Sequence, residues 1–177
     1  MKINYIQKDI FEAFDNNEID IIGHQTNCVT QSVAGFALYF FDKFPRIAEN
    51  HYKYIEKEDI FATNLYDIID NKLLVNMYSQ YYPGSPYNKK FLYKTLTYSD
   101  IFSIRCAALK RCLQSILELK FLKDNVILGI PLVASGIGAD LSKKANMTDL
   151  EYFKMYIEHI VLTAFNGKNI TINVYYL

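Results

Sequence analysis

The sequence has 177 residues, 51% of them hydrophobic and none of them tryptophan, with 19 basic and 19 acidic side chains. This length and apolar content predict a globular chain with one core, and we expect a single domain spanning residues 1–177. A formal net charge of zero argues against general nucleic-acid binding. No apolar run approaches about 20 residues, so no membrane partner is expected.

The three cysteines are Cys28, Cys106 and Cys112. Their odd number and the lack of CxxC or His/Cys spacing favour neither a disulfide framework nor a zinc site, so no metal or cofactor is predicted. Unpaired thiols are typical of a reducing compartment. Because no signal-peptide segment is evident at the N-terminus, we expect a cytoplasmic location.

Periodicity and turn residues divide the chain into alternating strands and helices. In chain order we expect strand 2–7, helix 10–14, strand 19–22, helix 33–43, helix 47–57, strands 60–66 and 72–78, a loop over 79–88, helix 98–119, strand 125–132, a loop over 133–140, helix 149–165 and strand 170–176. This alternation predicts an α/β architecture with a mixed central sheet and helices on both faces.

The stretch 19–45 organises the functional interpretation. An apolar strand is expected to break at Gly23 into the polar run 24–28, after which small residues open a helix that ends at Phe44-Pro45. A strand that feeds such a loop and helix is suited to bind an anion, because the first-turn amides have no internal partner. The loop has neither a P-loop nor a GxGxxG pattern. We therefore predict a phosphate-bearing ligand read mainly by the backbone.

A second loop with small residues, 133–140, follows the most hydrophobic strand. Ligands of α/β sheets bind outside the carboxyl ends of the strands. If the strands that end near Asn27 and Leu132 are neighbours, their two loops form the walls of a single cleft.

With both loops in view, the sequence resembles a macrodomain, the ADP-ribose-binding family with a three-layer α/β/α fold. The resemblance rests on an ordered set of motifs that spans nearly the whole chain: Lys8-Asp9-Ile10, His24-Gln25-Thr26-Asn27-Cys28, Ala34-Gly35, Phe44-Pro45, Ile130-Pro131-Leu132, Ala134-Ser135-Gly136-Ile137-Gly138 and the closing 172–177. The compact branch of ADP-ribose-1″-phosphate phosphatases, terminal ADP-ribose glycohydrolases and phage macrodomains is the most similar, since 76–80 resembles a segment of that branch.

The resemblance implies a set of ligand contacts. Asp9 would accept a hydrogen bond from the amino group of adenine, and the Ile10 amide would lie beside this contact. Asn27 would bind the hydroxyls of the distal ribose. Gly35, next to Ala34, would permit close approach of the backbone to the ligand. The amides of the second loop would wrap the diphosphate, and Tyr175 or Tyr176 would lie near the adenine. The diphosphate residues are Ser135, Gly136, Ile137, Gly138 and Ala139.

Several of these residues have a second reading. Asp9 is suited to capping a helix, a role that is compatible with ligand contact. Asn27 either holds the ligand or merely satisfies the backbone amides of its loop. His24 is either a structural histidine or a general acid near the distal phosphate, and Asp140 either a solvated loop residue or the activator of a water. Cys28 is better explained as buried filler than as a nucleophile. The segment 81–84 is either a lid with exposed tyrosines or simple packing.

The sequence departs from the branch in three places, one of which is Ala139-Asp140-Leu141-Ser142 in place of a Gly-rich ending. The first loop, 29–33, carries less glycine than usual, which favours a non-catalytic binding module or sponge. The glycohydrolase lysine has no counterpart, since Tyr78 or Ser79 falls near its place, and a covalent-lysine mechanism is therefore disfavoured. The leading expectation is hydrolysis of ADP-ribose-1″-phosphate with His24, Asn27 and Asp140 at the distal end. Removal of ADP-ribose from protein or nucleic acid is the alternative reaction.

Overall fold

A computed structural model describes residues 1–30, 34–55, 60–83, 102–119, 125–132 and 146–177. Its elements are β1 (Lys2–Gln7), α1 (Ile10–Asp15), β2 (Ile21–Asn27), α2 (Phe36–Lys43), α3 (Pro45–Tyr54), β3 (Asn64–Ile69), β4 (Lys72–Gln80), α4 (Phe102–Leu117), β5 (Val126–Pro131), α7 (Asp149–Tyr152), the π-helical turn η2 (Phe153–Ile157), α8 (Glu158–Ala164) and β6 (Ile170–Tyr176).

The six strands form one mixed sheet in the order β1-β6-β5-β2-β4-β3. Every neighbouring pair is parallel except β3 and β4, which are antiparallel. The predicted turn at Asp70-Asn71 joins those two strands, and both residues have positive φ. The expected mixed sheet is thus confirmed, and so is the central position of β5.

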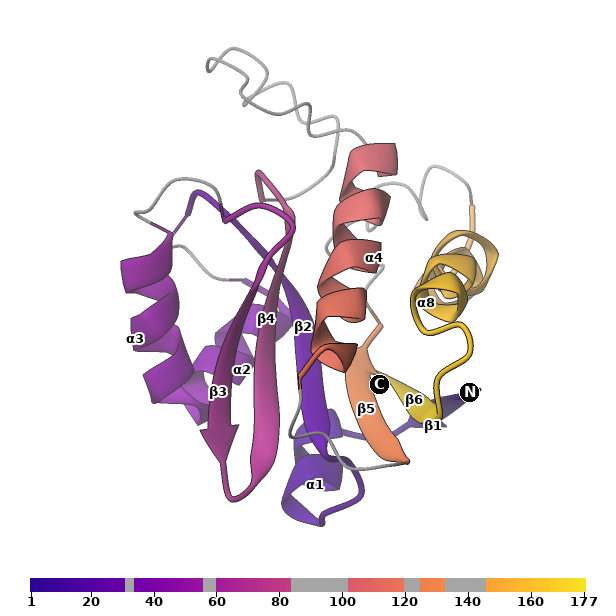
Figure 1. Ribbon diagram of the computed structural model, residues 1–177, viewed down its shortest axis with the longest axis horizontal. Coiled ribbons are helices and arrows are strands. Elements are labelled where there is room, and N and C mark those ends of the chain that lie inside the picture. Colours follow the sequence, from indigo (N-terminus) through magenta and orange to yellow (C-terminus); the bar gives the residue numbers. More distant parts are fainter. Residues whose placement is uncertain (31–33, 56–59, 84–101, 120–124, 133–145) are drawn as a thin grey trace.

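Helices cover both faces of the sheet (Figure 1). On one face α4, η2 and α8 pack on a core built around Met77, Leu128 and Ile172. On the other face α1, α2 and α3 pack on a second core that includes Ile22 and Leu74. Two apolar layers separated by one sheet are the predicted three-layer α/β/α arrangement.

The predicted boundaries of β2 and β4 are wrong. β2 starts at Ile21 and continues through Gly23 to Asn27, and β4 continues to Gln80 instead of giving way to a loop at Ser79. Two pairs of polar side chains near these ends bond from one strand to the other: His24 Nε2 lies 2.6 Å from Asn76 Oδ1, and Gln25 Nε2 donates to the Ser79 hydroxyl at 2.8 Å. A run of polar residues can therefore form a strand when the neighbouring strand supplies hydrogen-bond partners for its side chains.

Local sequence explains where most of the other helices and strands begin or end. Asp9 caps α1 as predicted, and Thr148 forms a capping box with Glu151 at the start of α7. The continuous helix predicted over 149–165 is interrupted by η2. The first strand and the last strand match their predicted bounds, whereas β3 lies about four residues later than expected.

Candidate functional site at the carboxyl edge of the sheet

The carboxyl edge, where β1, β6, β5 and β2 end at Gln7, Tyr176, Pro131 and Asn27, brings several predicted segments together. β2 and β5 pair in parallel, with Ile21 opposite Leu128 and Ile22 opposite Gly129. Parallel neighbours end at the same edge, so the strands that lead into the two predicted loops lie side by side, as expected.

The end of β6 joins this edge to the start of α1. The Lys8 amide donates to the Tyr176 carbonyl at 3.2 Å, and the Leu132 amide donates to the Tyr175 carbonyl at 2.9 Å. The Tyr175 side chain is only 3% exposed and packs in the core beneath α1 and α2. Tyr175 therefore contributes its backbone to the edge while its ring lies inside; its contact with adenine stays a prediction.

Asp9 uses one carboxylate oxygen as the cap of α1. Its Oδ1 accepts from the Phe11 amide at 2.6 Å and from the Glu12 amide at 3.3 Å. The side chain is exposed, and in the described part of the chain Oδ2 accepts no hydrogen bond. Capping and a contact with an adenine amino group are thus compatible. Ile10, which follows, buries its side chain and leaves its amide as the only group for a ligand.

Gly35 is the cap of α2 and has φ 57° and ψ −137°, a conformation that only glycine adopts readily. A Cβ at this position would meet no atom within 4 Å, so the backbone conformation, not a lack of space, requires glycine. Ala34 and Gly35 are both exposed. The backbone that leads into the positive end of α2 is therefore exposed.

The rings of Phe11 and Phe36 place these two helix starts next to each other. They stack in parallel with centroids 5.2 Å apart and planes 8° apart. Because Phe11 lies two residues after Asp9, and Phe36 directly after Gly35, the structure brings together two segments that the sequence predicted as ligand contacts.

Asn27 is 8% exposed and closes a turn at the end of β2. Its Oδ1 accepts from the amides of Val29 at 3.1 Å and Thr30 at 2.9 Å. The predicted role in satisfying loop amides is therefore observed. These two bonds also hold the side-chain amide in one orientation, which leaves Nδ2 as its donor for a ligand.

His24 is 1% exposed and lies among the rings of Phe36, Phe40 and Phe41. Its Nε2 is 2.6 Å from Asn76 Oδ1, and its Nδ1 is 3.1 Å from the Gln25 carbonyl. Burial lowers the pKa of His24 to about 4. Of its two open roles, this environment supports the structural one, because a buried neutral imidazole is a poor acid near pH 7.

A second buried histidine was missed by the sequence interpretation. His51 of α3 is 0% exposed, and its Nδ1 is 2.9 Å from the hydroxyl of Tyr78 on β4. Burial raises the pKa of Tyr78, so its hydroxyl stays protonated and can donate to the imidazole. Tyr78 packs against Cys28, the residue after Asn27. No sequence pattern indicated this pair, because the partners belong to different elements.

Arg105 of α4 is a further residue near this edge that the sequence interpretation did not single out. It is a charged side chain that is 0% exposed. It donates from Nη2 to the Tyr82 carbonyl at 3.0 Å, and Nη1 lies 3.4 Å from Gln80 Oε1. The Cys28 amide in turn donates to the Tyr81 carbonyl at 3.1 Å. Tyr81 is thus bonded to the chain just after β2 and Tyr82 to α4, as the packing interpretation of this segment predicts; Gly84 lies outside the described residues.

Cys28 itself is 5% exposed, and its thiol donates to the Gln80 carbonyl at 3.4 Å. This agrees with its reading as buried filler. The predicted diphosphate and water-activating residues all lie outside the described residues; they are Ser135, Gly136, Ile137, Gly138, Ala139 and Asp140.

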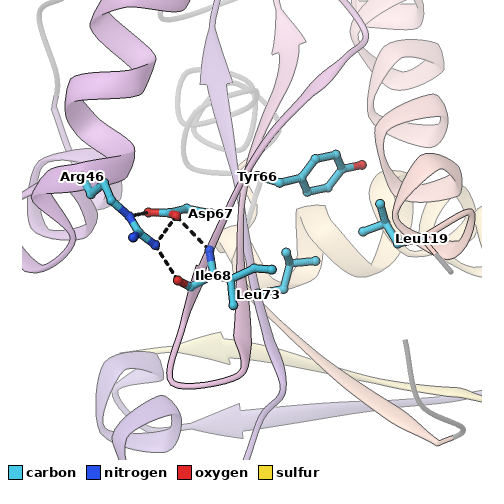
Figure 2. Close-up of a pocket in the computed structure, with 6 residues that line it drawn as sticks. All are labelled: Arg46, Tyr66, Asp67, Ile68, Leu73 and Leu119. Atoms are coloured by element: carbon cyan, nitrogen blue, oxygen red, sulfur yellow. Dashed lines mark hydrogen bonds and ion pairs between the residues drawn. The ribbon is translucent and has the colours of Figure 1, made fainter. Parts of the chain in front are cut away.

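Two hollows in the described structure lie along β3, the edge strand of the sheet. One, of about 350 Å³, is lined by Arg46, Asp67 and Leu119 among others (Figure 2). Arg46 reaches from α3 to the Asp67 carboxylate and the Ile68 carbonyl, with Nε 2.8 Å from Asp67 Oδ2. The other hollow lies between β3 and α4. Neither is lined by a residue that the sequence predicted as functional.

Over the described ranges, no group of three or more histidine, cysteine, aspartate or glutamate side chains is arranged to hold a metal ion. None of the described helices combines the length and apolar character needed to span a membrane.

Comparison of the sequence with protein-family models and with curated proteins finds no match. Solved structures do match over the whole chain. A Bacteroides thetaiotaomicron protein of unknown function is similar with a TM-score of 0.68 and 19% identity, over 100% of this chain and 99% of its own. The macrodomain of Thermus aquaticus DarG has a TM-score of 0.64 and 14% identity, over 99% and 98%.

Thermosipho africanus DarTG, solved in complex with ADP-ribose, has a TM-score of 0.60 and 11% identity, over 99% of this chain and 41% of its own. At such identities the likeness concerns the fold. Together with the order of the sheet and the helices on its two faces, it shows that this chain has the macrodomain fold.

Proposed function

We propose that this protein binds ADP-ribose or a close derivative at the carboxyl edge. The observation that carries the proposal is the convergence of Asp9, the start of α2 at Gly35, and Asn27 on this one edge. A carboxylate acceptor suits the adenine amine, helix amides suit a diphosphate, and an amide donor suits ribose hydroxyls. The complex of the Thermosipho africanus DarTG structure with ADP-ribose supports this choice of ligand.

In this proposal the ligand extends along the edge. Asp9 and the Ile10 amide bind the adenine, with the end of β6 at Tyr175 beside it. The amides at Ala34 and Gly35 face the diphosphate from one side, and the second loop, 135–139, encloses it from the other. Asn27 then meets the distal ribose through Nδ2.

The binding proposal is tested by calorimetry with ADP-ribose on the wild type and on Asp9→Asn. Asparagine keeps the cap through its oxygen, but it presents an NH₂ group where Oδ2 would accept from adenine. A charge-assisted hydrogen bond is worth about 1.5–3 kcal/mol, so we expect roughly 10- to 100-fold weaker binding with unchanged stability.

Asp9→Ala is the comparison variant, because it removes both functions. It should also lower the free energy of unfolding by about 1 kcal/mol. If Asp9→Asn binds ADP-ribose as tightly as the wild type does, Asp9 is a helix cap only.

The reaction that we propose is hydrolysis of the phosphomonoester of ADP-ribose-1″-phosphate. Asn27 supports it, because two hydrogen bonds in the turn hold its side-chain amide in one orientation, in which Nδ2 would be the donor to the distal end of the ligand. Asp140 is the proposed activator of water, and backbone amides would stabilise the charge that develops on the phosphate. His24 serves this reaction by holding β2 and β4 together rather than as an acid.

Phosphate release from ADP-ribose-1″-phosphate is the direct assay. We expect turnover by the wild type and a loss of at least about 100-fold in kcat for Asp140→Asn, with ADP-ribose binding retained. The same enzyme offered ADP-ribosylated protein or nucleic acid distinguishes phosphatase from ADP-ribosyl hydrolase.

A non-catalytic ADP-ribose-binding module is the second candidate function. The buried, neutral state of His24 favours it, because one of the three side chains expected to take part in the reaction is not placed to transfer a proton. Tight binding of ADP-ribose without turnover of either kind of substrate would select this function.

A further inference from the structure

Phe11 and Phe36 lie between two segments to which the proposed function gives different parts of one ligand. Asp9 and Ile10 precede Phe11, whereas Ala34 and Gly35 precede Phe36. The two rings stack face to face, with centroids 5.2 Å apart and planes within 8° of parallel. This contact joins the start of α1 to the start of α2.

Each ring is also held from another side. Phe36 contacts the rings of His24 at 5.6 Å and Phe40 at 5.9 Å, which fixes it on β2 and on its own helix. Phe11 contacts the ring of Phe44 at 6.1 Å, at the other end of α2. Both helix starts therefore take part in one packed set of rings, which links them directly.

We infer that Phe11 and Phe36 are a positioning pair that sets the distance between the adenine contact at Asp9 and the diphosphate contact at the start of α2. This inference rests on the proposed function. A ligand recognised at two places binds tightly only when both places are held at the separation that the ligand requires. Neither ring needs to touch the ligand for this effect.

A merely structural role predicts a different outcome. If the pair only packs α1 on α2, its loss lowers stability, and it changes the affinity for whole and partial ligands alike. If the pair sets a spacing, the affinity for each part of the ligand is kept, and the gain from joining the parts is reduced. Fragments of ADP-ribose distinguish the two roles.

The experiment measures binding of ADP-ribose, AMP and ribose 5-phosphate by NMR titration to the wild type, Phe11→Leu and Phe36→Leu. Leucine keeps an apolar side chain but removes the stack. We expect the Kd for ADP-ribose to rise roughly 3- to 10-fold, as the loss of an aromatic pair predicts, while the Kd for each fragment changes less than about 2-fold. Phe11→Tyr keeps the stacked ring and should restore binding of ADP-ribose.

Phe14→Leu is the matched control. Phe14 is on the same helix, is 3% exposed and packs edge-on against Phe44, but it is not part of the stack. Phe14→Leu should lower stability without a selective loss of affinity for ADP-ribose relative to its fragments. Thermal unfolding checks that every variant is folded. An equal loss for ADP-ribose and both fragments, or no loss for ADP-ribose, overturns the inference. A wild type that binds no ADP-ribose overturns the proposed function first, and the inference with it.

Discussion

His24 and His51 lie under the carboxyl edge, and burial lowers the pKa of each imidazole to about 4. Both are therefore neutral near pH 7, with one donor and one acceptor each. If the Asn76 amide is turned so that Nδ2 faces His24, Nδ2 donates to Nε2 of the neutral imidazole. The proton of His24 is then on Nδ1, which donates to the Gln25 carbonyl. That arrangement also gives Asn76 Nδ2 a partner, which it otherwise lacks in the described structure.

These lowered pKa values predict a pH dependence of stability. An unfolded histidine has a pKa near 6.5, so between pH 6.5 and 4 the unfolded chain binds more protons than the folded chain. The free energy of unfolding should therefore reach its full value above pH 6.5, where both histidines are neutral in either state, and it should decrease as the pH falls towards 4. The expected loss from His24 is roughly 3 kcal/mol between pH 7 and pH 4, and His51 adds a loss of the same sign.

Denaturant unfolding at pH 7, 5.5 and 4 measures this loss. His159 on α8 is exposed, so His159→Asn is the control for replacing a histidine outside the buried pair, and the loss that His24 and His51 cause should persist in it. A free energy of unfolding that stays constant between pH 7 and pH 5 would contradict the assigned burial of the two rings.

At the scale of an element, α2 shows how one residue decides where a helix can begin. Gly35 turns the chain into the helix with a positive φ, and no side-chain cap is present in the described residues around it. The apolar side chains Phe36, Phe40 and Phe44 then recur every four residues on the face that packs against α1. The glycine thus determines the direction of the amides, and the aromatic face determines the position of the helix.

Gly35→Ala should therefore affect both stability and binding. A non-glycine residue in this conformation costs roughly 1–3 kcal/mol, and relief of that strain would rotate the first amides of α2. We expect a lower free energy of unfolding together with weaker ADP-ribose binding by calorimetry.

Gly167→Ala is the control for strain alone. Gly167 also has positive φ, and a Cβ added to it would meet no atom within 4 Å, but it follows α8 at the opposite end of the strands. The substitution should lower stability by about 1 kcal/mol without changing affinity. Equal affinities of Gly35→Ala and the wild type would show that the start of α2 does not contact the ligand.

At the scale of the whole molecule, the position of α1 on the sheet depends on Gly129 of β5. A Cβ there would lie 2.6 Å from Ile19 Cδ1 and 3.4 Å from Ile10 Cδ1. Ile19 precedes β2, and Ile10 opens α1, so this glycine lets three parts of the chain meet without overlap. Because Ile10 directly follows Asp9, a shift of Ile10 away from Gly129 would also move Asp9.

Gly129→Val should push α1 away from the sheet. Overpacking of a filled core costs about 1–3 kcal/mol, and the shift of Asp9 should weaken ADP-ribose binding as well. Gly23→Ala tests the addition of a methyl group elsewhere in the sheet; its Cβ would be in ordinary contact at 3.5 Å, so its free energy of unfolding should change by less than about 0.5 kcal/mol. Unchanged unfolding of Gly129→Val would show that α1 moves freely on β5.

Much of the fold was predictable because its determinants are local. Strands β1 and β6, the cap at Asp9 and the turn at Asp70-Asn71 follow from alternation, capping and turn preferences over a few residues. The predicted break at Gly23 was wrong for the opposite reason. Whether the polar residues after it form a loop or a strand depends on Asn76 and Ser79 across the ladder, about 52 and 54 positions away from their partners.

The sequence by itself determined the alternation of strands and helices, the caps, and the ordered motifs from which a macrodomain was predicted, because each depends on neighbouring residues and on their order. Only the tertiary structure decided that His24 is a buried neutral ring, that His51 meets Tyr78, and that Phe11 stacks on Phe36. Burial and ring contacts arise when distant segments pack together, and the pKa of a side chain follows from that packing rather than from its place in the chain.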